Sequence, residues 1–334
     1  MKLSNKNYAM PTTRVGRAEL PRLIMGIHPY DGCSYVDAAR DALNYRRYNR
    51  VSKVVPILRY AAQYAGVTAV QVDHMLPVLN RLHLQAVWEA EQESDLSIDR
   101  IAYILIPILL DSANVEYAPR AHTTSIARNE GVAGQAFWDH FLRDPILKYN
   151  LGGSYERLNR PEAVPPYTPA EAERFTIDYG MLEQYLGFFA GCEIPVADPG
   201  AEIDLLAMTG RFDLIREYIA FLRARYDTVI TSVHHAGVTI PLLEREGIEV
   251  DGYLTPVNAL GAAMTPTRDI ALDALRQTRK PIIAIKPMAG GRYLGPKAFE
   301  YVYNEVGVAA TMFGMGTLAQ VRETTRWART VLGL

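Results

Sequence analysis

The sequence has little cysteine and no excess of charge of either sign. Its 334 residues include only two cysteines, Cys33 and Cys192, which lie far apart and form no CxxC pair. This favours reduced thiols over a disulfide framework and gives no cysteine spacing typical of a metal site. Lys and Arg number 35 against 37 Asp and Glu, and no basic run stands out. Nucleic acid is therefore not expected as a partner.

Long apolar runs are also missing. The longest, IAYILIPILL at 101–110, covers about half of a membrane span. The opening MKLSNKNYAMPTTRVGRAEL lacks the apolar core of a signal peptide. We therefore expect a cytoplasmic protein with a small-molecule substrate and no membrane partner, and the sequence leaves a homo-oligomer open.

Eight short apolar segments rich in β-branched residues are present, and they alternate with longer segments of helical periodicity. Such alternation is typical of βα units, and eight parallel strands close a barrel. We therefore predict an α/β fold, a (β/α)8 TIM barrel, as a single domain over residues 1–334. The predicted strands cover residues 22–28, 67–73, 100–109, 192–198, 228–234, 250–258, 281–287 and 307–315.

Helical patterns between these strands are clearest over 51–65, 212–225 and 317–332. Two further helices have recognisable starts. Thr168 is followed by Pro169 and by Glu171, which completes a capping box, and TPTRDIALDALRQ begins in a similar way at Thr265.

One connection is much longer than a crossover helix requires. Residues 111–190 separate the third and fourth strands, and we expect helix in the second half of 121–145. Insertions after a barrel strand rise over the end that carries the active site, so this one is predicted to act as a lid. An oligomer contact or an accessory subdomain is the alternative.

Polar residues stand at the C-terminal ends of the predicted strands, where a barrel collects its active site. Four of the seven histidines lie there, which favours function over packing. Adjacent strand residues face opposite sides, so we expect His234 rather than His235 to face the barrel axis. The candidate catalytic residues are Asp73, His74, Asp198, His234 and Lys286.

These side chains suggest specific roles. Asp73 and His74 would act as acid and base, and His234 would polarise or ligate. Lys286 ends an apolar strand, where burial lowers an amine pKa and suits a base or a Schiff-base nucleophile. A divalent metal is a further option, although no HExxH motif supports it, with His28, His74, Glu193, His234 and His235 as candidate ligands.

Two glycine-rich loops follow the seventh and eighth predicted strands. Glycine lets backbone N–H groups approach an anion, and a helix N-terminus favours negative charge. Loops in these positions often form the phosphate site of a barrel. The candidate phosphate or carboxylate ligands are Gly290, Gly291, Arg292, Gly314, Gly316 and Thr317.

The chain resembles the aldo-keto reductase superfamily over about two thirds of its length. TSVHHAGVTIPLLEREGIEVDGYLTPVNALG is similar to that family's fifth and sixth strands, and PIIAIKPMAGGR to its seventh. GVAATMFGMGTLAQVRETTRWA is similar to its eighth strand and cofactor-phosphate helix, while TRVGRAELPRLIMGIHPYDG and GVTAVQVD are similar to its opening strands. The resemblance implies a barrel and NADP as a cofactor.

The family's catalytic residues are only partly present. The resemblance carries its catalytic aspartate to Asp73, but Val78 stands near the position of its tyrosine and the third strand has no lysine. Asp198 replaces its histidine, His234 and His235 replace the serine and asparagine that hold the nicotinamide amide, and Ile285 replaces the tyrosine that stacks on the ring.

Three hypotheses follow. The first is a non-redox enzyme, a lyase, isomerase or hydrolase, acting on a small polar metabolite that carries a phosphate or carboxylate. The second is an NADP-dependent oxidoreductase in which Tyr117, Tyr155 or Tyr167 supplies the missing proton donor. The third is a non-catalytic ligand-binding barrel.

Overall fold

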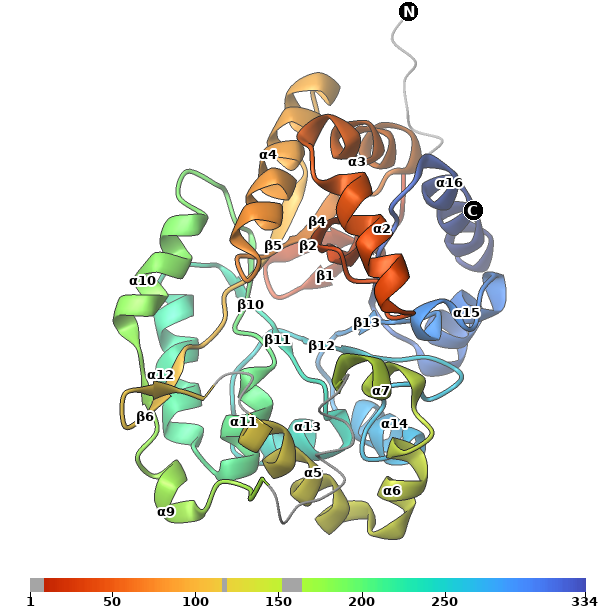
Figure 1. The fold of residues 1–334 in the computed structure, drawn as a ribbon. Coiled ribbons are helices and arrows are strands. Elements are labelled where there is room, and N and C mark those ends of the chain that lie inside the picture. Colours follow the sequence, from red (N-terminus) through yellow and green to blue (C-terminus); the bar gives the residue numbers. More distant parts are fainter. Residues whose placement is uncertain (1–8, 116–118, 152–163) are drawn as a thin grey trace, which may run out of the picture.

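The computed structural model describes residues 9–115, 119–151 and 164–334. Eight parallel β-strand segments form a closed ring, and helices surround it (Figure 1). The strands are β3 (Leu23–Met25), β4 (Ala69–Val72), β5 (Asp99–Tyr103), β9 (Val196–Asp198), the pair β10 (Thr228–Val229) and β11 (Thr231–Ser232), β12 (Tyr253–Pro256), β13 (Ile282–Ile285) and β14 (Ala310–Phe313).

The ring closes through the fifth segment. The hydrogen-bonded order runs β10-β9-β5-β4-β3-β14-β13-β12-β11, and only Ile230 separates its two ends. The Ile230 amide donates to the Ala197 carbonyl on one side, and the Thr231 amide donates to the Gly252 carbonyl on the other. The predicted (β/α)8 TIM barrel is therefore confirmed, and each predicted apolar segment contains an observed strand.

An antiparallel hairpin, β1 (Thr12–Val15) and β2 (Ala18–Pro21), covers one end of the ring. Val15 and Leu20 are fully buried in a cluster with inward-facing residues of the strands, such as Ile24. The backbone amides of Arg17 and Ala18 donate to Oγ1 of Thr228, the first residue of β10. The N-terminal end of the barrel is thereby closed, so a ligand can enter only from the opposite end.

Most of the surrounding helices pack on the outer face of the ring, whereas α1 and α2 lie at its C-terminal end. The prediction at 51–65 matches α3 (Val51–Ala65) to the residue, whereas the helix predicted from Thr265 starts later, because the side chain of Thr267 caps it by accepting from the Ile270 amide. The others are α1 (His28–Asp31), α2 (Ala38–Tyr48), α4 (Pro77–Ser94), α11 (Glu202–Thr209), α12 (Phe212–Arg223), α13 (Ala236–Arg245), α14 (Arg268–Gln277), α15 (Pro296–Glu300) and α16 (Leu318–Val331). Within the described residues, no helix has both the length and the hydropathy needed to cross a bilayer.

The insertion between β5 and β9 has its own small sheet and helices. Strands β6 (Ile108–Leu110), β7 (Ala113–Asn114) and β8 (Thr176–Ile177) pair antiparallel, so the predicted 100–109 strand is in fact two strands. Both halves of 121–145 are helical, where helix was expected in the second alone. The helices are α5 (Pro119–Ala133), α6 (Gln135–Phe141), α7 (Pro145–Leu151), α9 (Pro169–Ala172) with the predicted capping box, and α10 (Tyr179–Phe188).

Candidate functional site

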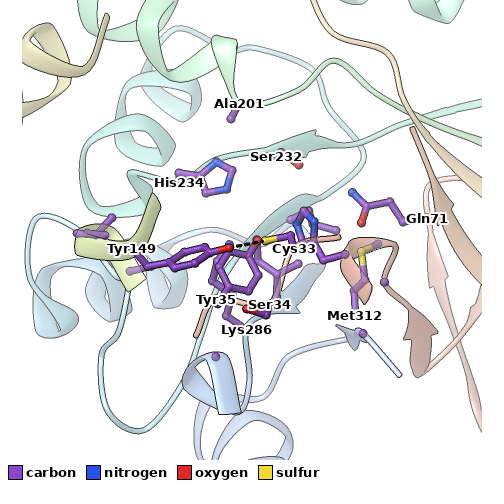
Figure 2. A pocket seen from close by; sticks show the side chains of 18 of the residues that line it. Cys33, Ser34, Tyr35, Gln71, Tyr149, Ala201, Ser232, His234, Lys286 and Met312 are labelled. Carbon is purple, nitrogen blue, oxygen red and sulfur yellow. Dashed lines mark hydrogen bonds between the residues drawn. The ribbon is translucent and has the colours of Figure 1, made fainter. Parts of the chain in front are cut away.

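A cavity of about 1260 Å³ opens at the C-terminal end of the barrel. Its wall combines residues that follow the strands with residues from the insertion, as Figure 2 shows for Lys286, His234, Cys33 and Tyr149. The insertion thus lies beside the mouth of the barrel, where it was expected. Its action as a lid stays a prediction.

Lys286 follows directly after β13 and lines this cavity. Its backbone has a φ of 55°, in the left-handed region, which is uncommon for a residue with a side chain. The ammonium group lies 4.8 Å from the ring centroid of Tyr35, and within the described part of the chain it has no ion pair or hydrogen bond. Burial lowers the pKa of Lys286 to about 8, while neighbouring Cys33 and Asp144 oppose the shift.

Asp73 follows β4 and lines the same cavity. Its Oδ1 accepts a hydrogen bond of 2.7 Å from the Met75 amide. Burial raises the pKa of Asp73 to about 6, against the opposing effect of that hydrogen bond. A carboxyl group with this pKa can both accept and return a proton near neutral pH.

His234 and His235 follow β11, and both line the cavity. His235 is held in place, because its Nδ1 lies 2.8 Å from Thr265 Oγ1 and 2.9 Å from Asn129 Nδ2 of the insertion. Burial lowers the pKa of His235 to about 4. Burial also lowers the pKa of His234 well below its usual range, with further contributions from Lys286, His235 and His28, so His234 faces the cavity as a neutral imidazole.

His28 also lines the cavity, but it already has a partner. Its Nδ1 lies 2.8 Å from Asp31 Oδ2, and its ring packs edge-on against Tyr35 at 5.1 Å. His28 contributes to lowering the pKa of His234 and opposes the raised pKa of Asp73, so it lies near both residues.

His74 does not lie where it was expected. Its ring stacks on Tyr185 of α10 at 3.9 Å, and its Nε2 accepts from the Leu105 amide at 3.3 Å. Burial lowers its pKa to about 4. His74 therefore packs beneath the insertion as a neutral ring and forms no part of the cavity wall, which corrects its assignment as an acid or base.

Asp198 is also a structural residue. Its Oδ2 accepts from Ser232 Oγ at 2.5 Å, and its Oδ1 accepts from the amides of Ser232 and Gly200 at 2.8 and 3.0 Å. The side chain is almost fully buried, and the residue does not line the cavity. Asp198 thus fixes the strand beside it, and its assignment to catalysis is corrected.

The proposed metal ligands do not form one cluster: His28, His234 and His235 line the cavity, whereas His74 and Glu193 do not. Glu193 raises the pKa of Asp99, the first residue of β5, so it lies toward the closed end of the barrel. Across residues 9–115, 119–151 and 164–334, no group of three or more His, Cys, Asp or Glu side chains is arranged to hold a metal ion. The donor set therefore does not fit a divalent metal.

The two glycines before α16 lie close to neighbouring side chains, where a larger residue would not fit. A Cβ on Gly314 would lie 2.7 Å from Pro29, and one on Gly316 would lie 2.4 Å from the Tyr48 hydroxyl. The Gly316 amide donates to Gln320 Oε1 at 2.8 Å, and Thr317 Oγ1 accepts from the Gln320 amide at 3.1 Å. The N-terminus of α16 is therefore already capped.

The loop after β13 is also partly engaged. Arg292 donates from Nη1 to the Tyr35 carbonyl at 3.0 Å, and Arg292 does not line the cavity, whereas Gly290 and Gly291 do. Gly314 and Gly316 line the cavity as well, so all four glycines of the two loops lie at its wall.

Of the three tyrosines proposed as proton donors for an oxidoreductase, Tyr167 lies within the described residues. Val78, near the position where the resemblance would place a tyrosine, is 74% exposed on α4. Tyr167 packs against Phe175 and under Arg120, whose guanidinium lies 4.3 Å from its ring, and it does not line the cavity. Tyr117 and Tyr155 lie outside the described residues.

Tyr35, Tyr149 and Asp204 are among the wall residues that sequence reasoning missed. Tyr149 donates to Asp41 Oδ2 at 2.5 Å. Asp204 accepts from the His234 amide at 2.7 Å and from the Thr239 hydroxyl. None of the three ends a strand, and only the acidic first turn of α11 at Asp204 gave a local signal.

No protein-family model and no curated protein sequence matches the chain. Among solved structures, a "putative aldo-keto reductase" from Pseudomonas aeruginosa aligns over 99% of both chains at 12% identity with a TM-score of 0.53. A second structure with this description, from the same organism, aligns over 99% of this chain and 100% of that chain at 11% identity, with a TM-score of 0.52. Glycerol dehydrogenase from Gluconobacter oxydans aligns over 97% of this chain and 94% of that chain at 10% identity, with a TM-score of 0.46. The chain therefore has the fold of the aldo-keto reductases.

Proposed function

We propose that the protein is an enzyme that acts on a carbonyl compound, with the Lys286 amine as its nucleophile. The observation that carries this proposal is a buried lysine with no counter-ion, placed where a barrel strand opens into a large cavity. Groups with strongly shifted pKa values in a cleft are typical of functional sites.

The shifted pKa matters because only the neutral amine is nucleophilic. With a pKa of about 8, about a tenth of Lys286 is neutral at pH 7, against about one part in 3,000 for a lysine at 10.5. The neutral amine adds to the carbonyl carbon, a proton moves from nitrogen to oxygen, and loss of water leaves an imine. A protonated imine withdraws electrons from the neighbouring carbon, which suits lyase or isomerase chemistry.

Asp73 and His234 are the groups we assign to the proton transfers. Asp73, with a pKa of about 6, is mostly ionised at pH 7 and can accept a proton and return it to the departing water. His234 is neutral and can donate or accept a hydrogen bond at the carbonyl oxygen without adding positive charge beside Lys286.

A second candidate is an NADP-dependent oxidoreductase. The fold likeness to aldo-keto reductases favours it. The exposed Val78 at the place of the family's tyrosine counts against it. We assign no step to the cofactor.

Reductive trapping tests the first candidate. The protein is incubated with pyruvate, butanal or octanal in the presence of cyanoborohydride, and the modified lysine is located by mass spectrometry. We expect the adduct at Lys286 and its loss in Lys286→Met. The control is Lys280→Met, which removes the lysine at the other end of β13, where the amine is paired with Glu244 at 3.1 Å.

The two candidates separate in a parallel titration with NADPH followed by nicotinamide fluorescence. Trapping at Lys286 without NADPH binding supports the first candidate. Saturable NADPH binding with labelling of Lys286 no greater than that of the other lysines supports the second and overturns the first.

A further inference from the structure

The cavity is much larger than the amine site requires. Its volume of about 1260 Å³ exceeds the range of roughly 300–1,000 Å³ that is typical of pockets for drug-sized ligands. A small polar metabolite bound at Lys286 would leave most of this space to water. The part of the wall that the insertion supplies shows what else can occupy it.

Among the described residues, that part of the wall is mainly apolar and carries no permanent charge. The described insertion residues that line the cavity are Val115, Ala121, His122, Ser125, Ile126, Asn129, Phe137, Phe141, Leu147 and Tyr149. Burial lowers the pKa of His122, which keeps it neutral. A phosphate or carboxylate would find no cationic partner among these side chains.

Most of the polar groups on this wall already have partners within the protein. Ser125 Oγ donates to the Ala121 carbonyl at 3.1 Å, and Asn129 Nδ2 donates to the Ser125 carbonyl at 2.7 Å. The Tyr149 hydroxyl donates to Asp41. The surface offered to a ligand is therefore mainly hydrocarbon.

The apolar wall leads directly to the reactive amine. Leu147 contacts the cluster of Ile126, Phe137 and Phe141 on one side, and on the other it joins a cluster that includes Tyr35 and Ala289. Tyr35 packs over Lys286 at 4.8 Å (Figure 2). A carbonyl carbon at Lys286 can thus carry a chain that runs along Leu147 toward α5 and α6.

We propose that the substrate is a carbonyl compound with an aliphatic chain, bound with its carbonyl at Lys286 and its chain against the insertion. This inference rests on the proposed function and replaces the small charged metabolite expected from the sequence. Each methylene that enters the apolar wall should tighten binding about fourfold until the wall is covered.

Two homologous series test the two parts of the inference separately. Straight-chain alkanals from four to eight carbons are trapped at Lys286 with cyanoborohydride, and the half-saturating concentration is measured. Alkanols of the same lengths form no imine and report on the apolar wall alone. Their binding is followed by the fluorescence of Trp138, whose ring lies 5.3 Å from Phe137, in a chain with Trp88 and Trp327 replaced by Phe.

Two variants alter the apolar wall, and a third alters a residue of the insertion outside it. Leu147→Asn puts a polar group in the middle of the path, and Ser125→Phe fills part of it. The control is Leu142→Asn, on a residue of the same insertion that is 49% exposed and does not line the cavity. If Leu147→Asn lowers the melting temperature, its binding data are set aside and Ser125→Phe alone tests whether the chain lies against this wall.

The inference is supported if both series tighten with length in the wild type and in Leu142→Asn but not in Ser125→Phe. It is overturned if binding does not depend on chain length in either series. Alkanol binding that tightens with length, without any alkanal adduct at Lys286, overturns the proposed function and with it the carbonyl part of this inference.

Discussion

Burying an ammonium group without a counter-ion costs free energy, because water no longer stabilises its charge. Lys286 carries this cost at the end of β13, with an aromatic ring as its neighbour. A methionine of similar length would pack there without the cost of burying a charge. The residue thus lowers stability where it provides a reactive amine, which is the usual trade-off at active sites.

We predict that Lys286→Met stabilises the protein at pH 7. The pKa of Lys286 is about 8 in the folded protein and near 10.5 when unfolded, so its contribution falls as the pH drops from 10.5 to 8. At pH 7 the full cost, up to about 3 kcal/mol, is present. Urea unfolding at pH 7 and pH 10 measures it. A gain as large at pH 10 as at pH 7 would show that charge burial is not the cause.

His83 is a second buried group whose charge is disfavoured. It stacks on Tyr30 at 5.0 Å, and neither ring nitrogen has a hydrogen-bond partner in the described structure. Burial lowers the pKa of His83 to about 4, while Asp31 opposes the shift. His83 does not line the cavity at the barrel mouth, and we assign the ring a packing role.

Replacing His83 by Leu should therefore raise stability. Removing two unpaired nitrogens is expected to gain about 1–3 kcal/mol at pH 7. The folded pKa is depressed, so the histidine contributes fully above pH 6.5 and loses stability as the pH falls toward 4. The gain should be larger at pH 5. Gln85→Leu, exposed on the same helix, is the control, and a smaller gain at pH 5 than at pH 7 would contradict this account.

At the scale of elements, a buried carboxylate is one of the groups that fasten the insertion to the barrel. Asp144 lies between α6 and α7, and its Oδ1 accepts from the amides of Ile146 and Leu147 at 2.8 and 3.0 Å. Its Oδ2 accepts from the Ala263 amide in the loop after β12 at 2.5 Å. These bonds fix the start of α7, and α7 carries Leu147 and Tyr149 into the cavity wall.

Asp144→Ala should loosen this region while leaving the barrel folded. Three buried amides lose their acceptor, at a cost of about 1–3 kcal/mol each if no water replaces it. Limited proteolysis should then cut within 134–151 faster than elsewhere. Asp139→Ala, on the exposed side of α6, should leave the rate unchanged. Equal rates in the two variants would show that Asp144 does not anchor the insertion.

The strands were predictable because parallel strands buried on both faces form apolar runs, and all eight runs contain a strand. The directions in which the polar side chains after these strands point could not be predicted. Asp73 turns into the cavity, whereas the next residue, His74, turns beneath α10. That difference depends on the insertion packing over it, which no local pattern records. Tyr149 was missed for the same reason.

The resemblance to aldo-keto reductases predicted the fold of the whole molecule but not the use of its loops. Gly314 and Gly316 lie in the segment that resembles the family, and Pro29 and Tyr48 approach them so closely that no larger residue would fit. Both residues belong to segments after β3 that lie distant in sequence from the glycines. The contact follows from closure of the ring, which brings β3 beside β14.

At the scale of the whole molecule, buried histidines and buried carboxyls should change the stability in opposite directions as the pH falls. The pKa values of His74, His83 and His235 are lowered to about 4, so they destabilise the fold as the pH falls below 6.5. Burial raises the pKa of Asp73 and Asp198 to about 6. A carboxyl with a raised folded pKa loses stability as the pH rises, so acidification restores it. The carboxyls therefore offset part of the loss from the histidines.

Asp204 makes this compensation testable, because burial raises its pKa to about 7. Its unfavourable contribution is greatest above pH 7 and disappears toward pH 3.8, so acidification from pH 7 to pH 5 recovers about 2 kcal/mol. Asp204→Asn cannot recover it, and the variant should lose about 2 kcal/mol more than the wild type over that range. Urea midpoints at the two pH values measure the difference. Asp269→Asn, in the first turn of α14 and exposed, should keep the wild-type slope, and an equal slope in Asp204→Asn would mean that this carboxyl does not titrate in the folded protein.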